Sequence, residues 1–89
     1  MKIELQKFGE FLTSRPAGRE AWFSAKAYTL DKINPKEKIE VDFTGIKVLT
    51  PSWADEFISA LMTEYPGRVV LIPSNNSSVN ASLEFVRVK

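Results

Sequence analysis

The chain has 89 residues, of which 44% are hydrophobic, 11% aromatic and 26% charged, and its formal net charge is +1. This composition is typical of one small folded domain, which we place at residues 1–89, and it argues against a basic surface for nucleic acid or an anionic membrane. Cysteine and histidine are both absent, which excludes disulfides, thiol nucleophiles and most zinc sites. The lack of cysteine, of a signal sequence and of ~20 consecutive apolar residues favours a cytoplasmic protein.

Two short strands are expected near the start of the chain. Residues 2–8 alternate polar and apolar side chains, as a half-buried strand does. Gly9 allows a turn, and residues 10–13 form a short second strand or an extension of the first.

An amphipathic helix follows these strands. Ser14 is suited to an N-cap, and Pro16 is tolerated in a first helical turn because its missing N–H would have no helical partner there. Asn34-Pro35 ends the pattern, since the residue before proline is disfavoured in a helix. The predicted apolar face, between Arg19 and Ile33, consists of Trp22, Phe23, Ala27, Leu30 and Ile33.

A second strand and helix occupy the middle of the chain. Residues 38–43 alternate again and predict a strand, which Ile46 and Val48 extend past a turn at Thr44-Gly45. The helix after the loop stops at Pro66-Gly67. Its predicted apolar face consists of Ala54, Phe57, Ile58, Leu61 and Met62.

The last unit is again a strand followed by a helix. Residues 68–72 form a largely apolar run, which predicts a strand covered on both faces. A polar loop over 73–78 leads to a helix that Ser77 or Ser78 caps. Strands and helices therefore alternate, which predicts an α/β fold with a small, mostly parallel or mixed sheet of 3–4 strands and three helices. The last helix is expected to bury Val79, Leu83 and Val86.

Three segments resemble a known fold. They are Phe8-Gly9 with Thr13-Ser14-Arg15, then Val41-Asp42-Phe43-Thr44-Gly45-Ile46, and finally Thr50-Pro51-Ser52-Trp53-Ala54-Asp55-Glu56-Phe57. In this order they are similar to the STAS domain, the fold of anti-sigma-factor antagonists, over residues 2 to 86. The closer resemblance is to a STAS-like family of unknown function whose members are often found beside histidine-kinase-type ATPases.

The resemblance implies partner switching, in which a kinase-like anti-sigma factor phosphorylates a serine at the helix start and so releases the antagonist. The loop of such antagonists typically reads Asp-Ser-Ser-Gly, and here Thr50-Pro51-Ser52-Trp53 occupies the matching positions. Pro51 stands at the phosphorylated position and has no hydroxyl, so Thr50 and Ser52 are the candidate phosphorylation sites. Asp55 and Glu56 would repel an added phosphate unless a cation intervened.

The same loop has a purely structural interpretation. Ser52 with Asp55 three residues later fits a capping box, with Asp in place of the usual Glu or Gln. Thr50 with Pro51 at the first helical position is the alternative cap. Either arrangement satisfies free N–H groups at the helix start without any further function.

Arg15 and Trp53 complete the candidate surface. Loops after parallel strands emerge at the same edge of a sheet, so Arg15 could approach Asp55 or Glu56 if their strands are neighbours. Such an ion pair is either structural or part of a polar patch that a partner recognises. Trp53 is either a core anchor or an exposed contact residue.

The sequence indicates that the protein is not an enzyme. Adjacent helical residues point about 100° apart, so Asp55 and Glu56 should not share one reacting atom. Histidine and cysteine are missing, and the glycines form no phosphate-binding motif. We therefore expect no catalytic residue, no metal and no cofactor.

Two functions remain open. The leading one is a non-enzymatic regulatory module that binds a protein partner, for which the resemblance implies a histidine-kinase-like ATPase, through residues 50–60. The alternative is an unswitched structural or inhibitory binding protein that self-associates through residues 69–72 or an N-terminal edge strand. We expect a monomer or weak homodimer with no nucleic-acid or membrane partner. The predicted contact residues are Arg15, Thr50, Ser52, Trp53, Asp55 and Glu56.

Overall fold

Two small parallel sheets form the strand layer of the computed structural model, which describes residues 1–87. Every strand pairing in this part of the chain is parallel, which confirms the predicted α/β class. The described strands number five in two sheets, rather than three or four in one. Strands β1 (Lys2–Glu4), β3 (Ile39–Asp42) and β5 (Val69–Leu71) form one sheet in the order β1-β3-β5, and β2 (Phe11–Leu12) pairs with β4 (Val48–Leu49) in the other.

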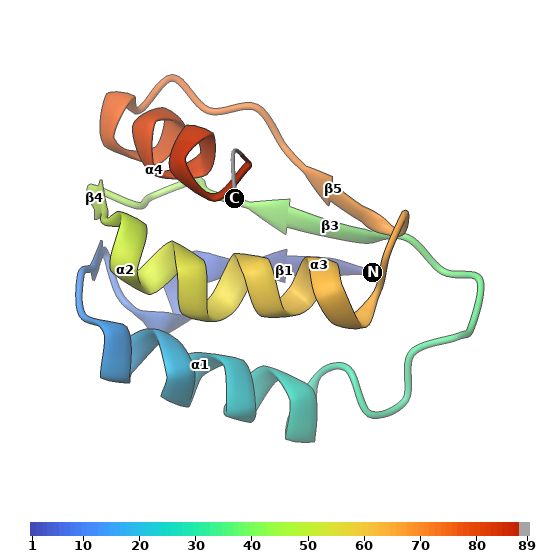
Figure 1. The fold of residues 1–89 in the computed structure, drawn as a ribbon. Coiled ribbons are helices and arrows are strands. Elements are labelled where there is room, and N and C mark those ends of the chain that lie inside the picture. The colour runs from blue at the N-terminus through green and yellow to red at the C-terminus, as the bar shows by residue number, and fades with distance from the viewer. Residues whose placement is uncertain (88–89) are drawn as a thin grey trace.

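A central helix over residues 51–64 lies between two others, α1 (Arg15–Tyr28) and α4 (Ser77–Arg87) (Figure 1). We call it the α2–α3 helix. It consists of α2 (Pro51–Ala54), a π-helical segment (Asp55–Ser59) and α3 (Ala60–Glu64). The three expected helices are therefore present, and the middle one passes in front of β1 in Figure 1.

The three-stranded sheet buries only one of its faces. Ile3, Ile39 and Val41 are fully buried, whereas Glu4 and Glu40 alternate with them and are exposed. Successive side chains of a strand point to opposite faces, so the helices cover one face and the other is open to solvent.

An aromatic cluster forms the centre of the core, beneath the α2–α3 helix. The ring of Phe57 stacks on Trp53 with centroids 5.0 Å apart and meets the edge of Trp22 at 6.0 Å. Phe8 reaches the same ring at 5.5 Å. Such aromatic pairs stabilise a core by more than their area burial alone. The cluster therefore joins the N-terminal segment, α1 and the α2–α3 helix.

The first predicted strand is too long. Strand β1 ends at Glu4, and Leu5–Phe8 form a 3₁₀ helix. A 3₁₀ helix places residues three apart on one side, so Leu5 and Phe8 both turn toward the core. Leu5 is fully buried and Phe8 packs on Phe57. The second predicted strand is confirmed as the two-residue β2.

Helix α1 begins where its predicted cap places it but ends earlier than its apolar pattern predicts. Ser14 is the N-cap, as expected, and its Oγ accepts a hydrogen bond of 3.1 Å from the Ala17 amide. The helix ends at Tyr28 rather than Ile33, and Leu30 returns to the core in the following turn. The buried face is also displaced: Phe23 is 60% exposed, while the buried helical residues are Gly18, Ala21, Trp22 and Ala25. Small residues permit the close approach of the α2–α3 helix.

Two strand predictions also need correction. Val48 does not extend the strand over 38–43 but belongs to the separate strand β4, which pairs with β2. Strand β5 is not covered on both faces, because it lies at the sheet edge and Val70 is 42% exposed. Along the α2–α3 helix, Met62 is 39% exposed although it was predicted to face inward.

Helix α4 buries Val79, Leu83 and Val86 as predicted, but its cap is Asn76 rather than Ser77 or Ser78. The Asn76 Oδ1 accepts hydrogen bonds from the Ser78 amide at 2.8 Å and the Val79 amide at 3.1 Å. Its Nδ2 donates to the carbonyl oxygens of residues 46 and 47. Asparagine serves here because one amide can both cap the helix and hold the preceding loop.

Candidate functional site: a charged corner between two helix starts

Strands β2 and β4 bring the starts of two helices together. They are parallel neighbours, and each is followed within three residues by a helix, α1 after β2 and α2 after β4. Both helices therefore begin at the same sheet edge, where ligands of parallel sheets usually bind. This arrangement meets the condition under which Arg15 was expected to reach Asp55 or Glu56.

Thr50 links the start of α2 to the start of α1 through hydrogen bonds. It is the N-cap of α2, with Pro51 at the first helical position, so the second of the two predicted caps is the one formed. Its Oγ1 donates a hydrogen bond of 2.7 Å to the Thr13 carbonyl oxygen, just before α1. The Thr50 amide also donates to the Leu12 carbonyl oxygen at 3.0 Å.

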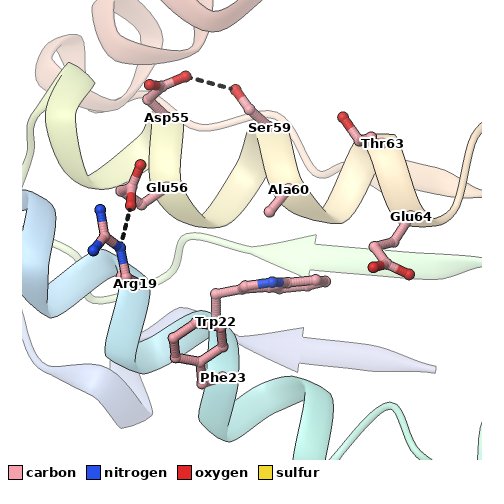
Figure 2. A pocket seen from close by; sticks show the side chains of 9 residues that line it. All are labelled: Arg19, Trp22, Phe23, Asp55, Glu56, Ser59, Ala60, Thr63 and Glu64. Carbon is pink, nitrogen blue, oxygen red and sulfur yellow. Dashed lines mark hydrogen bonds and ion pairs between the residues drawn. The ribbon is translucent and has the colours of Figure 1, made fainter.

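Four charged side chains, Arg15, Arg19, Asp55 and Glu56, form what we call the charged corner. The Arg15 Nη1 lies 2.9 Å from Asp55 Oδ2 and 2.9 Å from Glu56 Oε2. The Arg19 Nε donates to Glu56 Oε1, also at 2.9 Å. The predicted approach of Arg15 to the two acids is therefore confirmed, and a second arginine completes the network (Figure 2 shows the Arg19–Glu56 contact).

The two carboxylates contact one nitrogen atom, contrary to the expectation that they would not. Asp55 and Glu56 are adjacent, but both accept from the Arg15 Nη1. They open the π-helical segment Asp55–Ser59, whose i→i+5 hydrogen bonding gives a wider turn than an α-helix. In addition, Ser59 Oγ donates to Asp55 Oδ1 at 3.1 Å, which fixes the aspartate side chain (Figure 2).

The charged corner favours the ionised form of Glu56. The side chains of Asp55 and Glu56 are only 13% and 19% exposed, whereas those of Arg15 and Arg19 are about half exposed. Hydrogen bonds from Arg19 and then Arg15 hold the pKa of Glu56 below its usual value, although partial burial opposes this. Hydrogen bonds to Asp55 and Glu56 likewise raise the pKa of Arg15.

We predict that this network makes stability depend on acid pH. The unfolded chain protonates Glu56 near the usual pKa of 4.5, whereas the folded chain does so at lower pH. The contribution is therefore complete above pH 4.5 and is lost as pH falls through the lower folded pKa. Urea unfolding at pH 7 and pH 3.5 should show a smaller acid-induced loss for Glu56→Gln than for the wild type. An equal loss in both would contradict the prediction, and Glu20→Gln on the exposed side of α1 is the matched control.

The remaining predicted site residues divide between core and surface. Trp53 is 1% exposed, so of its two interpretations the core anchor is correct and its assignment as a partner-contact residue is wrong. The reason is that it points inward onto Phe57 and Phe8. Thr50 is committed to the cap. Ser52 is partly exposed beside the charged corner and forms no capping box, because Thr50 fills that role.

A groove of about 440 Å³ runs along the charged corner between α1 and the α2–α3 helix. Figure 2 shows Trp22 and Phe23 on one wall and Glu56, Ala60 and Glu64 facing them from the other. Phe23 is 60% exposed, whereas Trp22 is largely buried at the base. Glu64, which also lines the groove, forms an ion pair of 3.0 Å with Lys26 of α1. The groove is thus an apolar strip bordered by paired charges.

Sequence reasoning missed Arg19 and Phe23. Arg19 lies four residues after Arg15, the spacing that places two side chains on one helix face, so this signal was available. The sequence pattern predicts that Phe23 is buried, because its spacing fits a helical stripe as well as that of Trp22 does. Only the position of the neighbouring helix decides which of the two adjacent aromatics is covered.

Residues 1–87 contain neither a metal-binding cluster nor a membrane-spanning helix. No group of three or more Asp, Glu, His or Cys side chains in this part of the chain is placed to hold a metal ion. Within the same residues, no helix has both the length and the apolar character needed to cross a bilayer.

The fold and the charged corner define an α/β domain whose two helix starts are joined at one edge of a small parallel sheet. Residues 27–81 match the profile of a family described as a STAS-like domain of unknown function (DUF4325). That segment is more than half of the chain, so the chain belongs to this family, as its motifs indicated. It contains Asp55 and Glu56, whereas Arg15 and Arg19 precede it. Searches among curated proteins and among solved structures gave no significant match.

Proposed function

We propose that the protein is a regulatory, non-enzymatic interaction module that binds a protein partner at the charged corner and the adjoining groove. The observation that carries this proposal is the combination of a hydrogen-bonded ion network with an exposed Phe23 at the mouth of an open groove. Protein interfaces are enriched in aromatic and arginine side chains that are surrounded by polar groups. The partner class that the family resemblance suggests is a histidine-kinase-like ATPase.

Binding suits the chemistry of the corner better than turnover does. A general acid or base needs a pKa near the working pH, but the arginines shift the pKa of Glu56 the other way. Both Glu56 oxygens already accept hydrogen bonds from arginines, and both Asp55 oxygens have partners in Arg15 and Ser59. A fixed pattern of charges is useful for recognition because it selects a complementary partner.

Glu56→Arg is the variant that tests this proposal. It places a third cation beside Arg15 and Arg19 and therefore disrupts the network without removing core volume. Against a purified histidine-kinase-like ATPase from the same organism, we expect the dissociation constant to rise at least about tenfold, since close charge pairs at interfaces contribute on that scale. Isothermal titration calorimetry measures the change.

Glu84→Arg on the exposed side of α4 is the matched control, because it makes the same change of charge away from the corner. Its affinity is expected to stay within about twofold of the wild type. Circular dichroism verifies that both variants are folded. Equal affinities of the two variants, or wild-type affinity in Glu56→Arg, would refute the proposed surface.

The second candidate is the unswitched binding protein, and the Thr50 contacts favour it. The Thr50 hydroxyl is committed to the helix cap and to the Thr13 carbonyl oxygen, so a phosphate there would break both contacts. Ser52 is the better acceptor of the two hydroxyls. Incubation with the ATPase and ATP followed by peptide mass spectrometry separates the candidates, because switching requires a phosphate on Ser52 or Thr50 and the unswitched protein takes none.

A further inference from the structure

The two edges of the three-stranded sheet differ in chemistry. Strand β1 carries the exposed charges of Lys2 and Glu4 on either side of its buried Ile3. At the opposite edge, residues 69–72 read Val-Val-Leu-Ile and contain no charge, and each is at least partly exposed. This edge lies well apart from the start of α1 in Figure 1, and thus from the charged corner.

An uncharged apolar edge strand requires an explanation. An edge strand presents unpaired backbone N–H and C=O groups that pair readily with another strand, and proteins usually prevent this with charges, prolines or bulges. Strand β1 has such protection in its two charged side chains. Strand β5 contains no charged residue and no proline. The next proline, Pro73, follows Ile72 beyond the end of the strand.

We propose that β5 pairs with β5 of a second copy of this chain, antiparallel about a two-fold axis at Val70. The two three-stranded sheets then form one six-stranded sheet. In this register Val70 faces Val70 of the second copy, and Val69 faces Leu71 of the second copy. Such an arrangement is self-complementary, as a two-fold interface requires, and its cross-strand pairs are β-branched or aliphatic.

The charge of the chain favours a second copy of the same chain as the partner that pairs with β5. The net charge of +1 produces little repulsion between two copies. The nearest cation, Arg68, is held by its own chain, where its guanidinium donates to the carbonyl oxygens of Glu37 at 3.0 Å and Asn34 at 2.7 Å. Antiparallel pairing about Val70 places Ile72 opposite Arg68, so no two like charges meet across the interface.

The length of β5 limits the strength of the dimer. The strand has three residues, and the apolar run extends one residue further to Ile72. Few backbone hydrogen bonds and a small apolar contact give an interface below the usual size of stable complexes. We therefore expect a reversible dimer with a dissociation constant of about 10 to 500 μM.

The test uses sedimentation velocity of the full chain from about 1 μM to 1 mM, together with the variants Val70→Lys and Val70→Glu. Val70 is 42% exposed on the open face, so a charged side chain there can remain in solvent in the monomer. Wild-type mass should rise toward that of a dimer with concentration. Each variant alone should dimerise at least about tenfold more weakly, because two like charges face each other across the axis. An equimolar mixture of the two should recover association, since Lys then faces Glu.

Phe85→Lys is the matched control, because it changes an apolar residue of similar exposure, 47%, on α4. Its association should equal that of the wild type. The proposal is overturned if the wild type stays monomeric up to 1 mM, which is about the upper limit of the assay. It is also overturned if Val70→Lys associates as the wild type does, if the mixture shows no recovery, or if Phe85→Lys is the variant that loses the dimer.

Discussion

Replacement of Trp53 by alanine is expected to lower the free energy of unfolding by about 3–5 kcal/mol, the usual cost of truncating a large buried aromatic. Trp53 is 1% exposed and packs on Phe57 and Phe8, so removal of its indole leaves a cavity that the helix backbone cannot close. Domains of this size have only about 5–15 kcal/mol of stability in total. Urea unfolding followed by circular dichroism measures the loss.

Phe23→Ala is the control for this prediction, because it removes another aromatic ring from a side chain that is 60% exposed. We expect it to change stability by less than about 1 kcal/mol. Equal urea midpoints for the two variants would show that Trp53 is not the core anchor described above. For the same reason, Trp53→Ala is unsuited to mapping the partner surface, since any loss of binding would follow from loss of the fold.

The second large effect is expected from Gly18→Ala, which should destabilise the domain by about 1–3 kcal/mol. A Cβ on Gly18 would lie 2.8 Å from the Trp53 carbonyl oxygen and 3.2 Å from the Glu56 Cβ. One of these contacts is with backbone, so α1 and the α2–α3 helix would have to separate. Helix propensity alone predicts the opposite sign, a gain of about 1 kcal/mol. The direction of the change in urea midpoint therefore distinguishes the two effects.

Ser24→Ala provides the comparison within the same helix. Ser24 is exposed, so its replacement should follow propensity and leave stability unchanged or slightly higher. If Gly18→Ala also raises the urea midpoint, α1 and the α2–α3 helix do not approach each other as closely as described above. If it lowers the midpoint, the acid-induced loss of stability should also shrink, because displacement of Glu56 weakens its contacts with Arg15 and Arg19.

The alternation of strands and helices could be predicted from sequence because it depends on local pattern, and the general position of the corner follows from that alternation. Alternating strand and helix periods imply parallel strands, and parallel strands bring successive helix starts to one edge. The approach of Arg15 to Asp55 and Glu56 follows from that rule once β2 and β4 are neighbours, and that pairing is known only from the structure. The contact of both acids with one nitrogen atom could not be predicted. It depends on a π-helical turn that the sequence of residues 55–59 does not indicate.

Other differences arise from tertiary packing. Residues 2–6 alternate as a strand does, but Leu5 and Phe8 are three residues apart, a step that puts them on opposite faces of a strand and on one side of a 3₁₀ helix. Packing of Phe8 on Phe57 accompanies the helix. On α1, the sequence pattern predicts burial of the aromatic stripe through Phe23 rather than of the small residues around Gly18. The small residues are covered because they alone admit the neighbouring backbone.

The cap of α4 and the exposure of β5 show two further limits of sequence reasoning. Ser77, Ser78 and Asn76 are all good capping residues, and only the position of the loop at residues 46–47 favours the amide side chain. The apolar run over 69–72 has the composition of a central strand. Its place at the edge is set by strand order, which local sequence does not encode.

The hydrogen bond between Thr50 and the Thr13 carbonyl oxygen has a consequence for the thermodynamics of association. Together with the burial of Trp53, it joins two surface loops to the best-packed part of the molecule, so these loops cannot open unless the interior opens as well. A partner docking there would meet a preorganised face and would lose little chain entropy in ordering it. If the proposed partner binds at this face, its affinity would therefore be set mainly by shape and charge, and the same rigidity would disfavour partners that require the face to change shape.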